Sequence, residues 1–244
     1  MCTVSFIARK RGYALAMNRD EKLSRVAGLP PKISVAGGRK IISPSEPGGG
    51  TWIAVNDTGA TFALINRYSI TARVRSNPVS RGGVVKVLRA LADPSSAAAR
   101  LGELPLKRMN AFRLIGFFPR TKEIIEWRWN LQKLFRKAHR WQAQQWISSG
   151  HDEPKAQKIR GATFRAALRQ KPAGTLAWLR RLHRSHAPER GPFSTCMHRA
   201  DAATVSCTEV SVSAGVAVMK HHASAPCEAG AVSKCRMKLN TAKS

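Results

Sequence analysis

The sequence predicts an α+β fold in which segments from both ends of the chain share a sheet. Short runs rich in β-branched and aromatic residues fill the first third, apolar residues at helical spacing follow, and alternating valines appear near the end. Hydrophobic residues make up 43% and charged residues 23% of the 244 positions, so the chain can bury a core and is not expected to be disordered. No internal repeat is evident. This order favours one domain over two independent ones.

Two hairpins are predicted in the first third. Their strand pairs are residues 2–8 with 13–18, and residues 51–55 with 60–66. The first pair flanks a four-residue turn at 9–12, and the second flanks Asn-Asp-Thr-Gly at 56–59, a strong turn signal. Prolines and glycines predict loops at 29–31 and 43–50.

The middle of the chain is predicted to be mainly helical, with one further hairpin of residues 110–118 and 123–129. The predicted helices are residues 83–92, 95–101, 131–147, 162–168 and 175–183. In residues 131–147 the apolar side chains fall on one helical face, namely Leu131, Leu134, Phe135, Ala138 and Trp141.

Near the C-terminus, alternating valines over residues 203–220 predict two strands around a turn at 213–215. Residues 228–244 are rich in Ala, Ser and Lys, so a disordered basic tail is expected there. The predicted domain therefore spans residues 1–227.

The charge is strongly positive. The chain has 42 Lys and Arg and 14 Asp and Glu, a net charge of +28, with the densest excess in residues 107–190. Such a charge attracts nucleic acid or anionic surfaces. The sequence contains no nucleic-acid recognition motif, such as paired aromatic residues on a strand, so nucleic-acid binding is the third-ranked hypothesis. No apolar run is long enough to cross a membrane, no secretory signal is evident, and the five cysteines form no CxxC pair. A cytoplasmic protein with reduced thiols is expected.

Cys2 is the first candidate for chemistry. If Met1 is removed, Cys2 carries both a thiol and a free α-amine. The amine can act as the base that a thiol nucleophile needs near neutral pH.

The first hairpin brings further groups to this cysteine. With the turn centred between Lys10 and Arg11, paired positions sum to about 21, which places Cys2 opposite Arg19 and beside Asn18 and Asp20. Asp20 could orient the α-amine, and Arg19 could stabilise negative charge on the thiolate or the substrate.

The second hairpin supplies a further candidate. With its turn centred between Asp57 and Thr58, the residue numbers of paired positions sum to about 115. Asn66 then lies opposite Gly49, in the glycine run that includes Gly50. Glycines let a ligand approach the backbone closely, and an Asn amide beside them could donate to an oxyanion. Together with Asn18, these two glycines are the predicted substrate-binding residues.

Several motifs resemble the NRDE family, also called the transport and Golgi organisation family. They are Met1-Cys2-Thr3, Asn18-Arg19-Asp20-Glu21, Gly49-Gly50-Thr51-Trp52, Leu64-Ile65-Asn66 and the stretch from Cys196 to Ser206. The resemblance extends from residue 1 to about residue 227. That family in turn is similar to the cysteine N-terminal-nucleophile hydrolases, which include penicillin V acylases and bile salt hydrolases. The similarity implies a four-layer αββα sandwich of antiparallel sheets and cleavage of non-peptide C–N amide bonds.

The resemblance also implies roles for single residues. Cys2 would be the nucleophile, Asp20 the carboxylate near the α-amine, and Asn66 an oxyanion-hole donor. The acylases carry an arginine three residues before the aspartate, where this chain has Met17, so Arg19 is a substitute rather than a matched residue. Arg199 is the nearest candidate for their late catalytic arginine. No cofactor is implied, and the expected partner is a small-molecule amide or another apolar or anionic ligand.

Two alternatives accompany the hydrolase hypothesis. A binding or trafficking protein for haem, lipid or membrane organisation could keep the same fold without turnover, and a nucleic-acid binder ranks third. No metal site is predicted: Cys196-x-His198 lacks the usual ligand spacing, and His221 and His222 would point to opposite faces of a strand, so ordinary packing is favoured.

Overall fold

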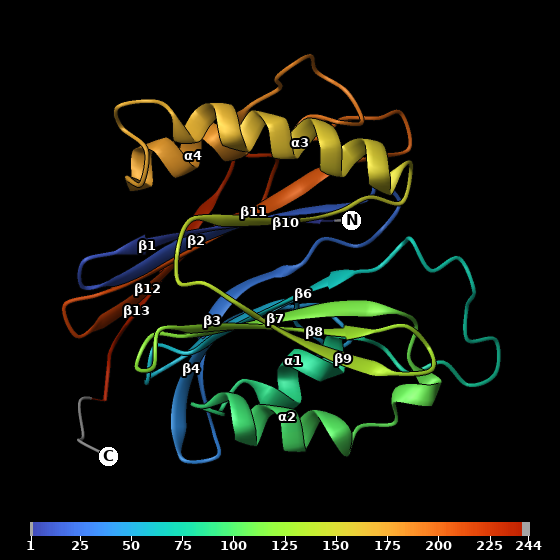
Figure 1. Cartoon of the computed structure of the whole chain (residues 1–244), viewed down its shortest axis with the longest axis vertical. Coiled ribbons are helices and arrows are strands. Elements are labelled where there is room, and N and C mark those ends of the chain that lie inside the picture. The colour runs from blue at the N-terminus through green and yellow to red at the C-terminus, as the bar shows by residue number, and fades with distance from the viewer. Residues whose placement is uncertain (1, 241–244) are drawn as a thin grey trace.

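The chain forms four layers, helix–sheet–sheet–helix, in a computed structural model that describes residues 2–240. Helices α3 (Glu153–Leu168) and α4 (Leu176–Arg184) cover the outer face of one sheet, and α1 (Gly82–Leu88) and α2 (Pro94–Gly102) cover the outer face of the other (Figure 1). A short 3₁₀ helix at Leu106–Arg108 precedes the central strands of the second sheet. The predicted α+β sandwich with antiparallel sheets is confirmed.

The first sheet draws its six strands from both ends of the chain. Its order is β10-β1-β2-β11-β12-β13, and every neighbouring pair is antiparallel. The strands are β10 (Gln144–Ser148), β1 (Cys2–Arg9), β2 (Gly12–Lys22), β11 (Ala202–Ser213), β12 (Val216–His222) and β13 (Val232–Lys238). This pairing puts the N-terminal strand β1 between β10 and β2, in a sheet that three strands from the C-terminal part of the chain complete.

The second sheet has seven strands in chain order, so each pairs with its sequence neighbour. They are β3 (Leu29–Ala36), β4 (Arg39–Ser45), β5 (Ile53–Asn56), β6 (Thr61–Asn66), β7 (Phe112–Phe118), β8 (Glu123–Trp129) and β9 (Leu134–His139). The predicted hairpin of residues 110–118 and 123–129 is confirmed as β7 and β8.

Apolar side chains fill all three spaces between the layers. The core between the sheets includes Phe6 of β1 stacked on Phe117 of β7, with ring centroids 5.2 Å apart. Separate clusters join the second sheet to α1 and α2, and the first sheet to α3 and α4. Burying one such aromatic side chain stabilises the fold by about 1.5–3 kcal/mol.

The register of the first hairpin agrees with the prediction, because Cys2 pairs with Arg19 across β1 and β2. The second hairpin is shifted by one position, with Ile53 opposite Ala63. Asn66 therefore has no partner in β5, which begins only at Ile53, and pairs instead with Phe112 of β7.

The predicted helix at 131–147 is wrong, because this segment forms β9 and β10 in different sheets. The Asn130 side chain accepts hydrogen bonds from the backbone N–H groups of Gln132 and Lys133, at 3.0 and 2.7 Å, and so forms the turn that leads into β9. β9 lies at the edge of its sheet and exposes Phe135, whereas Trp146 of β10 is buried between the sheets. The helical spacing of apolar residues here is coincidental.

Two segments predicted to be irregular form strands. Residues 29–31 and 43–45 belong to β3 and β4, joined by Gly37 and Gly38, both with positive φ. Two glycines at such positions suit a tight hairpin turn, and the prolines of β3 are tolerated because it is an edge strand with an irregular register. The predicted tail from residue 228 instead contains β13, which pairs with β12; residues 241–244 lie outside the described residues.

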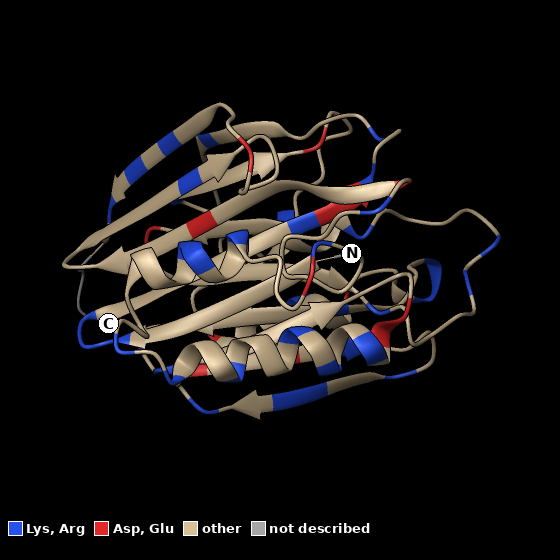
Figure 2. Cartoon of the chain, turned by 90° about the horizontal axis from the view of Figure 1, so that it is seen from above, with Lys and Arg blue, Asp and Glu red and all other residues tan. Residues whose placement is uncertain are grey.

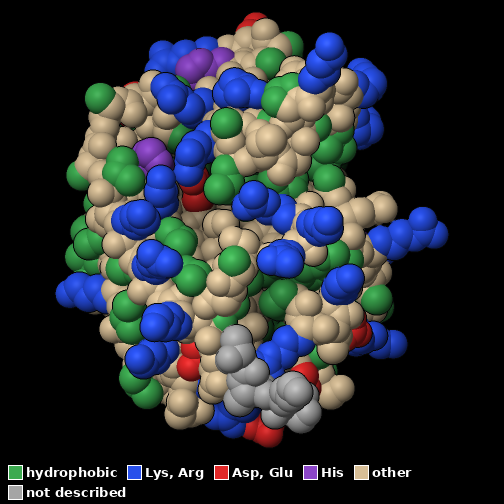
Figure 3. Space-filling model, turned by 90° about the vertical axis from the view of Figure 1, so that its left-hand side faces the viewer, with side chains coloured by type: hydrophobic (Ala, Val, Ile, Leu, Met, Phe, Trp, Pro, Cys, Tyr) green, Lys and Arg blue, Asp and Glu red, His purple; other side chains and the backbone are tan. Residues whose placement is uncertain are grey.

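The positive charge is widely distributed. Lys and Arg lie on helices and strands alike, whereas Asp and Glu positions are few (Figure 2). On the face drawn in Figure 3, basic side chains are scattered among other residues, unlike the continuous basic stripe typical of nucleic-acid binding. Over residues 2–240, no helix combines the length and apolar character needed to cross a membrane.

Candidate active site

A cavity of about 340 Å³ opens beside the first residue of β1. Its wall includes Cys2 and Arg19 from the first sheet and Leu64 and Asn66 from the second. Cys2 is 8% exposed, and its backbone N–H donates to Ser148 Oγ at 3.0 Å. The cysteine therefore lies at the wall of a cavity with its main chain fixed by the edge strand β10.

Arg19 occupies the cavity wall with its charge already partnered. Its Nη2 lies 2.9 Å from Glu46 Oε1, and its guanidinium stacks 4.8 Å from the ring centroid of Trp52. Arg25 also contacts Glu46, at 3.0 Å. The Arg19 side chain is only 6% exposed, so these contacts hold a cation close to Cys2.

Asn66 reaches the same cavity from the last position of β6. Its Nδ2 donates to Tyr68 Oη at 2.7 Å. A side-chain amide has two N–H donors, so one remains for a ligand. Cys2, Arg19 and Asn66, predicted from separate hairpins, thus line one cavity.

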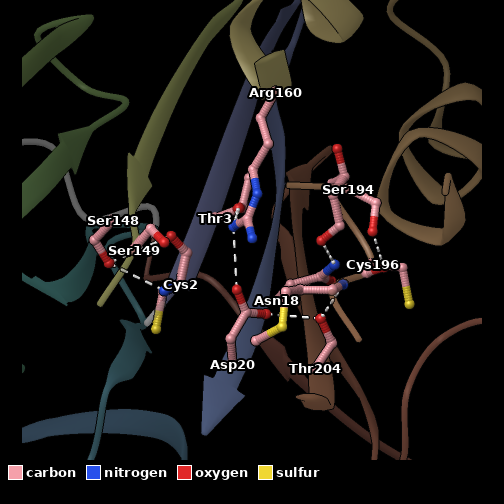
Figure 4. A network of polar contacts seen from close by, with 12 residues as sticks. Cys2, Thr3, Asn18, Asp20, Ser148, Ser149, Arg160, Ser194, Cys196 and Thr204 are labelled. Atoms are coloured by element: carbon pink, nitrogen blue, oxygen red, sulfur yellow. Dashed lines mark hydrogen bonds and ion pairs between the residues drawn. The ribbon is translucent and has the colours of Figure 1, made fainter. Parts of the chain in front are cut away.

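Asp20 lies on the opposite face of the first sheet from this cavity, because side chains alternate along β2. It is fully buried, and its carboxylate accepts from Arg160 Nη1 at 3.1 Å and from Thr204 Oγ1 at 2.7 Å. Figure 4 shows Arg160 extending from α3 past Thr3 toward Asp20, with Cys2 at the start of the adjacent strand. Arg160 and Thr204 thus hold the Asp20 carboxylate on the helix side of the sheet.

Asn18 is not a substrate-binding residue in this structure. It is fully buried on the helix side of the sheet, where its Nδ2 donates to the carbonyl oxygens of His183 and Thr195, both at 2.9 Å. Its Oδ1 lies 2.9 Å from His183 Nδ1. Asn18 therefore anchors α4 and the following loop to the sheet.

The two glycines lie behind the cavity wall rather than on it. Gly49 has a φ of +76°, and its N–H donates to the carbonyl of Glu46. A side chain at Gly50 would meet the backbone of Gly82 at 3.2 Å. They form a tight turn that positions Glu46 and Thr51, which do line the cavity.

The structure does not bring Arg199 to the cavity. Arg199 precedes β11, and its Nη2 forms an ion pair with Asp201 at 2.7 Å. The residue that reaches Asp20 is Arg160, whose guanidinium is fully buried. No local pattern singles out Arg160 among the basic residues of α3.

Burial raises the pKa of the Cys2 thiol. The negative charge of Asp20 adds to this rise, and the positive charge of Arg19 opposes it. An uncharged thiol is thus favoured until a base accepts its proton.

Arg81 also lines the cavity, and the sequence does not suggest it. Its Nη1 donates to the carbonyl of Ala111 at 3.2 Å, and within residues 2–240 it forms no ion pair. Burial lowers its pKa. A partly desolvated guanidinium without a carboxylate partner suits an anionic group of a ligand.

Comparisons with known proteins agree with this architecture. A search of curated proteins found no significant match. Penicillin V acylase from Agrobacterium tumefaciens has a similar structure, with a TM-score of 0.55 and 11% identity over 97% of this chain and 86% of that one. A mutant conjugated bile acid hydrolase from Clostridium perfringens gives a TM-score of 0.57 and 8% identity over 96% and 92% of the two chains. At such identities the likeness concerns the fold alone.

The family model described as Transport and Golgi organisation 2 matches residues 1–163, two thirds of the sequence. This range contains Cys2, Arg19, Asp20 and Asn66. The chain therefore belongs to the Transport and Golgi organisation 2 family.

Proposed function

We propose that this protein hydrolyses a small-molecule amide, with Cys2 as an N-terminal nucleophile after removal of Met1. The observation that carries the proposal is the position of Cys2, which lines the cavity together with Arg19 and Asn66. The family and the fold similarity to amide-cleaving enzymes support it.

In the proposed reaction the α-amine of Cys2 takes the thiol proton, and the thiolate attacks the amide carbon. The carbon–nitrogen bond then breaks, the leaving amine takes a proton from the α-ammonium, and a thioester remains. Water activated by the α-amine hydrolyses this thioester and restores the thiol. Ser148 would orient the amine, because its Oγ already accepts from the nitrogen of Cys2 at 3.0 Å. The negative charge of Asp20, on the other face of the sheet, would favour the protonated form of the amine.

The tetrahedral intermediate carries a negative oxygen that needs donors in a desolvated site. The free N–H of the Asn66 amide is the proposed donor, since Tyr68 fixes the amide plane from the other side. Arg19 adds positive charge nearby. Its pairing with Glu46 keeps it in place.

The proposed substrate carries an anionic group as well as the amide. Arg19 and Arg25 are paired with two carboxylates, Glu21 and Glu46, whereas Arg81 has no acidic partner among the described residues. A carboxylate on the substrate would pair with Arg81. Substrates with and without such a carboxylate should therefore differ in KM.

The experiment combines intact-mass analysis with a screen of N-acyl substrates in matched anionic and neutral forms. Met1 should be absent from the purified protein. Cys2→Ala should abolish turnover, and Arg81→Gln should raise KM for anionic substrates only. The matched control is Arg75→Gln, an exposed arginine outside the cavity, which should leave KM unchanged.

Retention of Met1 would contradict the mechanism, because Cys2 would then lack a free amine. Ligand binding in the cavity without turnover, unaffected by Cys2→Ala, would favour the alternative of a binding protein on the same fold.

A further inference from the structure

A second group of reactive side chains lies in two loops next to β11 and β12, outside the cavity. His186 follows α4, Cys196 and His198 precede β11, and Cys227 lies between β12 and β13. One ligand atom from each lies within 4.8 Å of all the others. We propose that these four residues bind one zinc ion in a tetrahedral site.

The separations between the candidate ligand atoms match such a site. With Zn–S near 2.3 Å and Zn–N near 2.0–2.1 Å, tetrahedral angles require about 3.8 Å between two sulfurs, about 3.6 Å between sulfur and nitrogen, and about 3.3 Å between two nitrogens. Here the two sulfurs are 3.4 Å apart, and His198 Nε2 lies 3.6 and 3.4 Å from them. The two Nε2 atoms are 3.2 Å apart. These four separations are close to the tetrahedral values, and His186 lies within 4.8 Å of both sulfurs, so a single ion can contact all four ligands once the His186 ring moves toward the sulfurs.

The donor set selects the metal. Two thiolates and two imidazoles in a tetrahedral arrangement suit Zn²⁺, and two thiolates neutralise its charge. All four atoms converge on one point, which suits one ion rather than a two-iron cluster. Both cysteines are free thiols in the structure. Cys196 is buried while the other three are partly exposed, so an ion has a route in.

One neighbouring contact must change when the metal binds. Arg190 Nη2 lies 3.1 Å from His198 Nδ1. Ligation through Nε2 puts the ring proton on Nδ1, so the guanidinium must leave this nitrogen. Arg190 is exposed and can do so at little cost. Arg190→Ala should therefore leave zinc binding intact or strengthen it.

The site would hold a loop that contacts the two hydrogen-bond partners of the buried Asp20 carboxylate, Thr204 and Arg160. Met197, between two of the ligands, accepts at its carbonyl from the backbone N–H of Thr204 at 2.8 Å, and Thr204 donates to Asp20. Pro192, in the same loop, accepts from Arg160 at 3.2 Å. Zinc would tie this loop to the one carrying Cys227, and its removal should lower the melting temperature.

The test uses the full chain, purified under reducing conditions with Zn²⁺ supplied, and measures metal content by mass spectrometry. About one zinc per chain is expected, and Co²⁺ in its place should give the visible absorption of tetrahedral coordination. Zinc binding should weaken by at least about tenfold in each of three variants, Cys196→Ser, Cys227→Ser and His186→Gln. Loss of a residue that only orients a metal ligand already weakens metal binding by about tenfold, and loss of the ligand itself should weaken it further. The matched controls Cys235→Ser and His222→Gln alter the same residue types outside the cluster and should bind as the wild type does.

If the Cys196→Ser variant does not fold, His186→Gln alone provides the test, because His186 is partly exposed. The Co²⁺ spectrum and the zinc-dependent rise in melting temperature of the wild type need no variant at all. Equal zinc content in ligand and control variants, or the lack of a tetrahedral Co²⁺ spectrum, would overturn the proposal. So would a Cys196–Cys227 disulfide in the protein as isolated from cells, seen as the loss of two hydrogens.

Discussion

The two faces of the first sheet differ sharply where β1 and β2 lie side by side. On the inner face, Cys2 and Arg19 line a cavity whose wall also includes Asn66 from the second sheet. On the outer face, Asn18 and Asp20 are fully buried beneath α3, α4 and the loop that follows. Neighbouring residues of β2 therefore face different surroundings: Arg19 lines a cavity that a ligand can enter, and Asn18 and Asp20 lie in a buried polar network.

This difference predicts that the outer-face residues stabilise the fold and that the inner-face residues act on a ligand. Each outer-face carboxylate and amide is matched by donors or acceptors from distant segments, so removing one leaves a buried partner unsatisfied. Inner-face groups keep access to a ligand. Substitutions on the outer face should therefore change the free energy of unfolding, and those on the inner face should change turnover.

The largest expected effect comes from Asp20→Asn. The variant keeps the shape of the side chain but leaves the guanidinium of Arg160 buried without its counter-charge. The free energy of unfolding should fall by about 3–5 kcal/mol, as measured by denaturant unfolding. Asp201→Asn, an exposed carboxylate whose ion pair lies at the surface, is the control and should cost far less. Similar losses in both variants would contradict the contrast between the faces.

The site residues that the sequence could predict are those placed by local hairpins, namely Cys2 and Arg19 in the first and Asn66 in the second. Cys2 and Arg19 are paired across a four-residue turn, so local spacing fixes their register. Arg160, Thr204 and Ser148 reach the same place from more than 120 residues away. No local pattern encodes such distances, so the sequence predicts a ligand contact for Asn18, whereas in the structure Asn18 contacts His183.

The fold was predictable where pairing is local or where family motifs lie. The helical spacing in residues 131–147 misled because the strand β10 is stabilised by pairing with β1, at the other end of the chain. Tertiary pairing of this kind overrides local periodicity. The edge strands β3 and β13 differ from the prediction because consecutive prolines at 30 and 31 indicate a loop and the Lys-rich composition after residue 228 indicates a tail, and these signals outweigh the apolar alternation that both strands contain.

The next effect concerns the inner face. Asn66→Ala should reduce kcat by about 10²- to 10³-fold, since it removes a preorganised donor to the oxyanion, with little change in stability. The measurement is steady-state kinetics on an amide that the wild type cleaves. Asn130→Ala removes an amide from the turn before β9, outside the cavity, and serves as the control for kcat. An unchanged kcat in Asn66→Ala would remove this residue from the proposed oxyanion hole.

A smaller effect should appear as acid sensitivity of the outer face. Burial, with a contribution from Arg160, lowers the pKa of His183 from 6.5 to about 3. The unfolded chain takes up a proton below about pH 6.5 while folded His183 stays neutral, so stability falls as the pH drops through this range. Between neutral or higher pH and pH 5 the loss approaches about 2 kcal/mol.

His183→Gln isolates this contribution. His221, whose pKa burial lowers to about 4, and other groups also titrate, so the informative quantity is the difference between wild type and variant. The wild type should lose more stability than His183→Gln over the same pH range in thermal unfolding. Parallel pH profiles for the two proteins would show that His183 is not the group responsible.

The smallest effect tests whether Arg19 acts on the thiol itself. Burial raises the pKa of Cys2 and Arg19 opposes that rise, so Arg19→Gln should raise the pKa further. Alkylation of Cys2, followed on the N-terminal peptide by mass spectrometry, should then need a higher pH to reach the same rate. Arg25→Gln is the matched control, because Arg25 shares Glu46 with Arg19 but is half exposed. Equal shifts in both variants would mean that the pKa of Cys2 responds to the summed charge of the cavity mouth. A shift in Arg19→Gln alone would tie thiolate formation to the guanidinium of the residue that β2 places directly opposite Cys2.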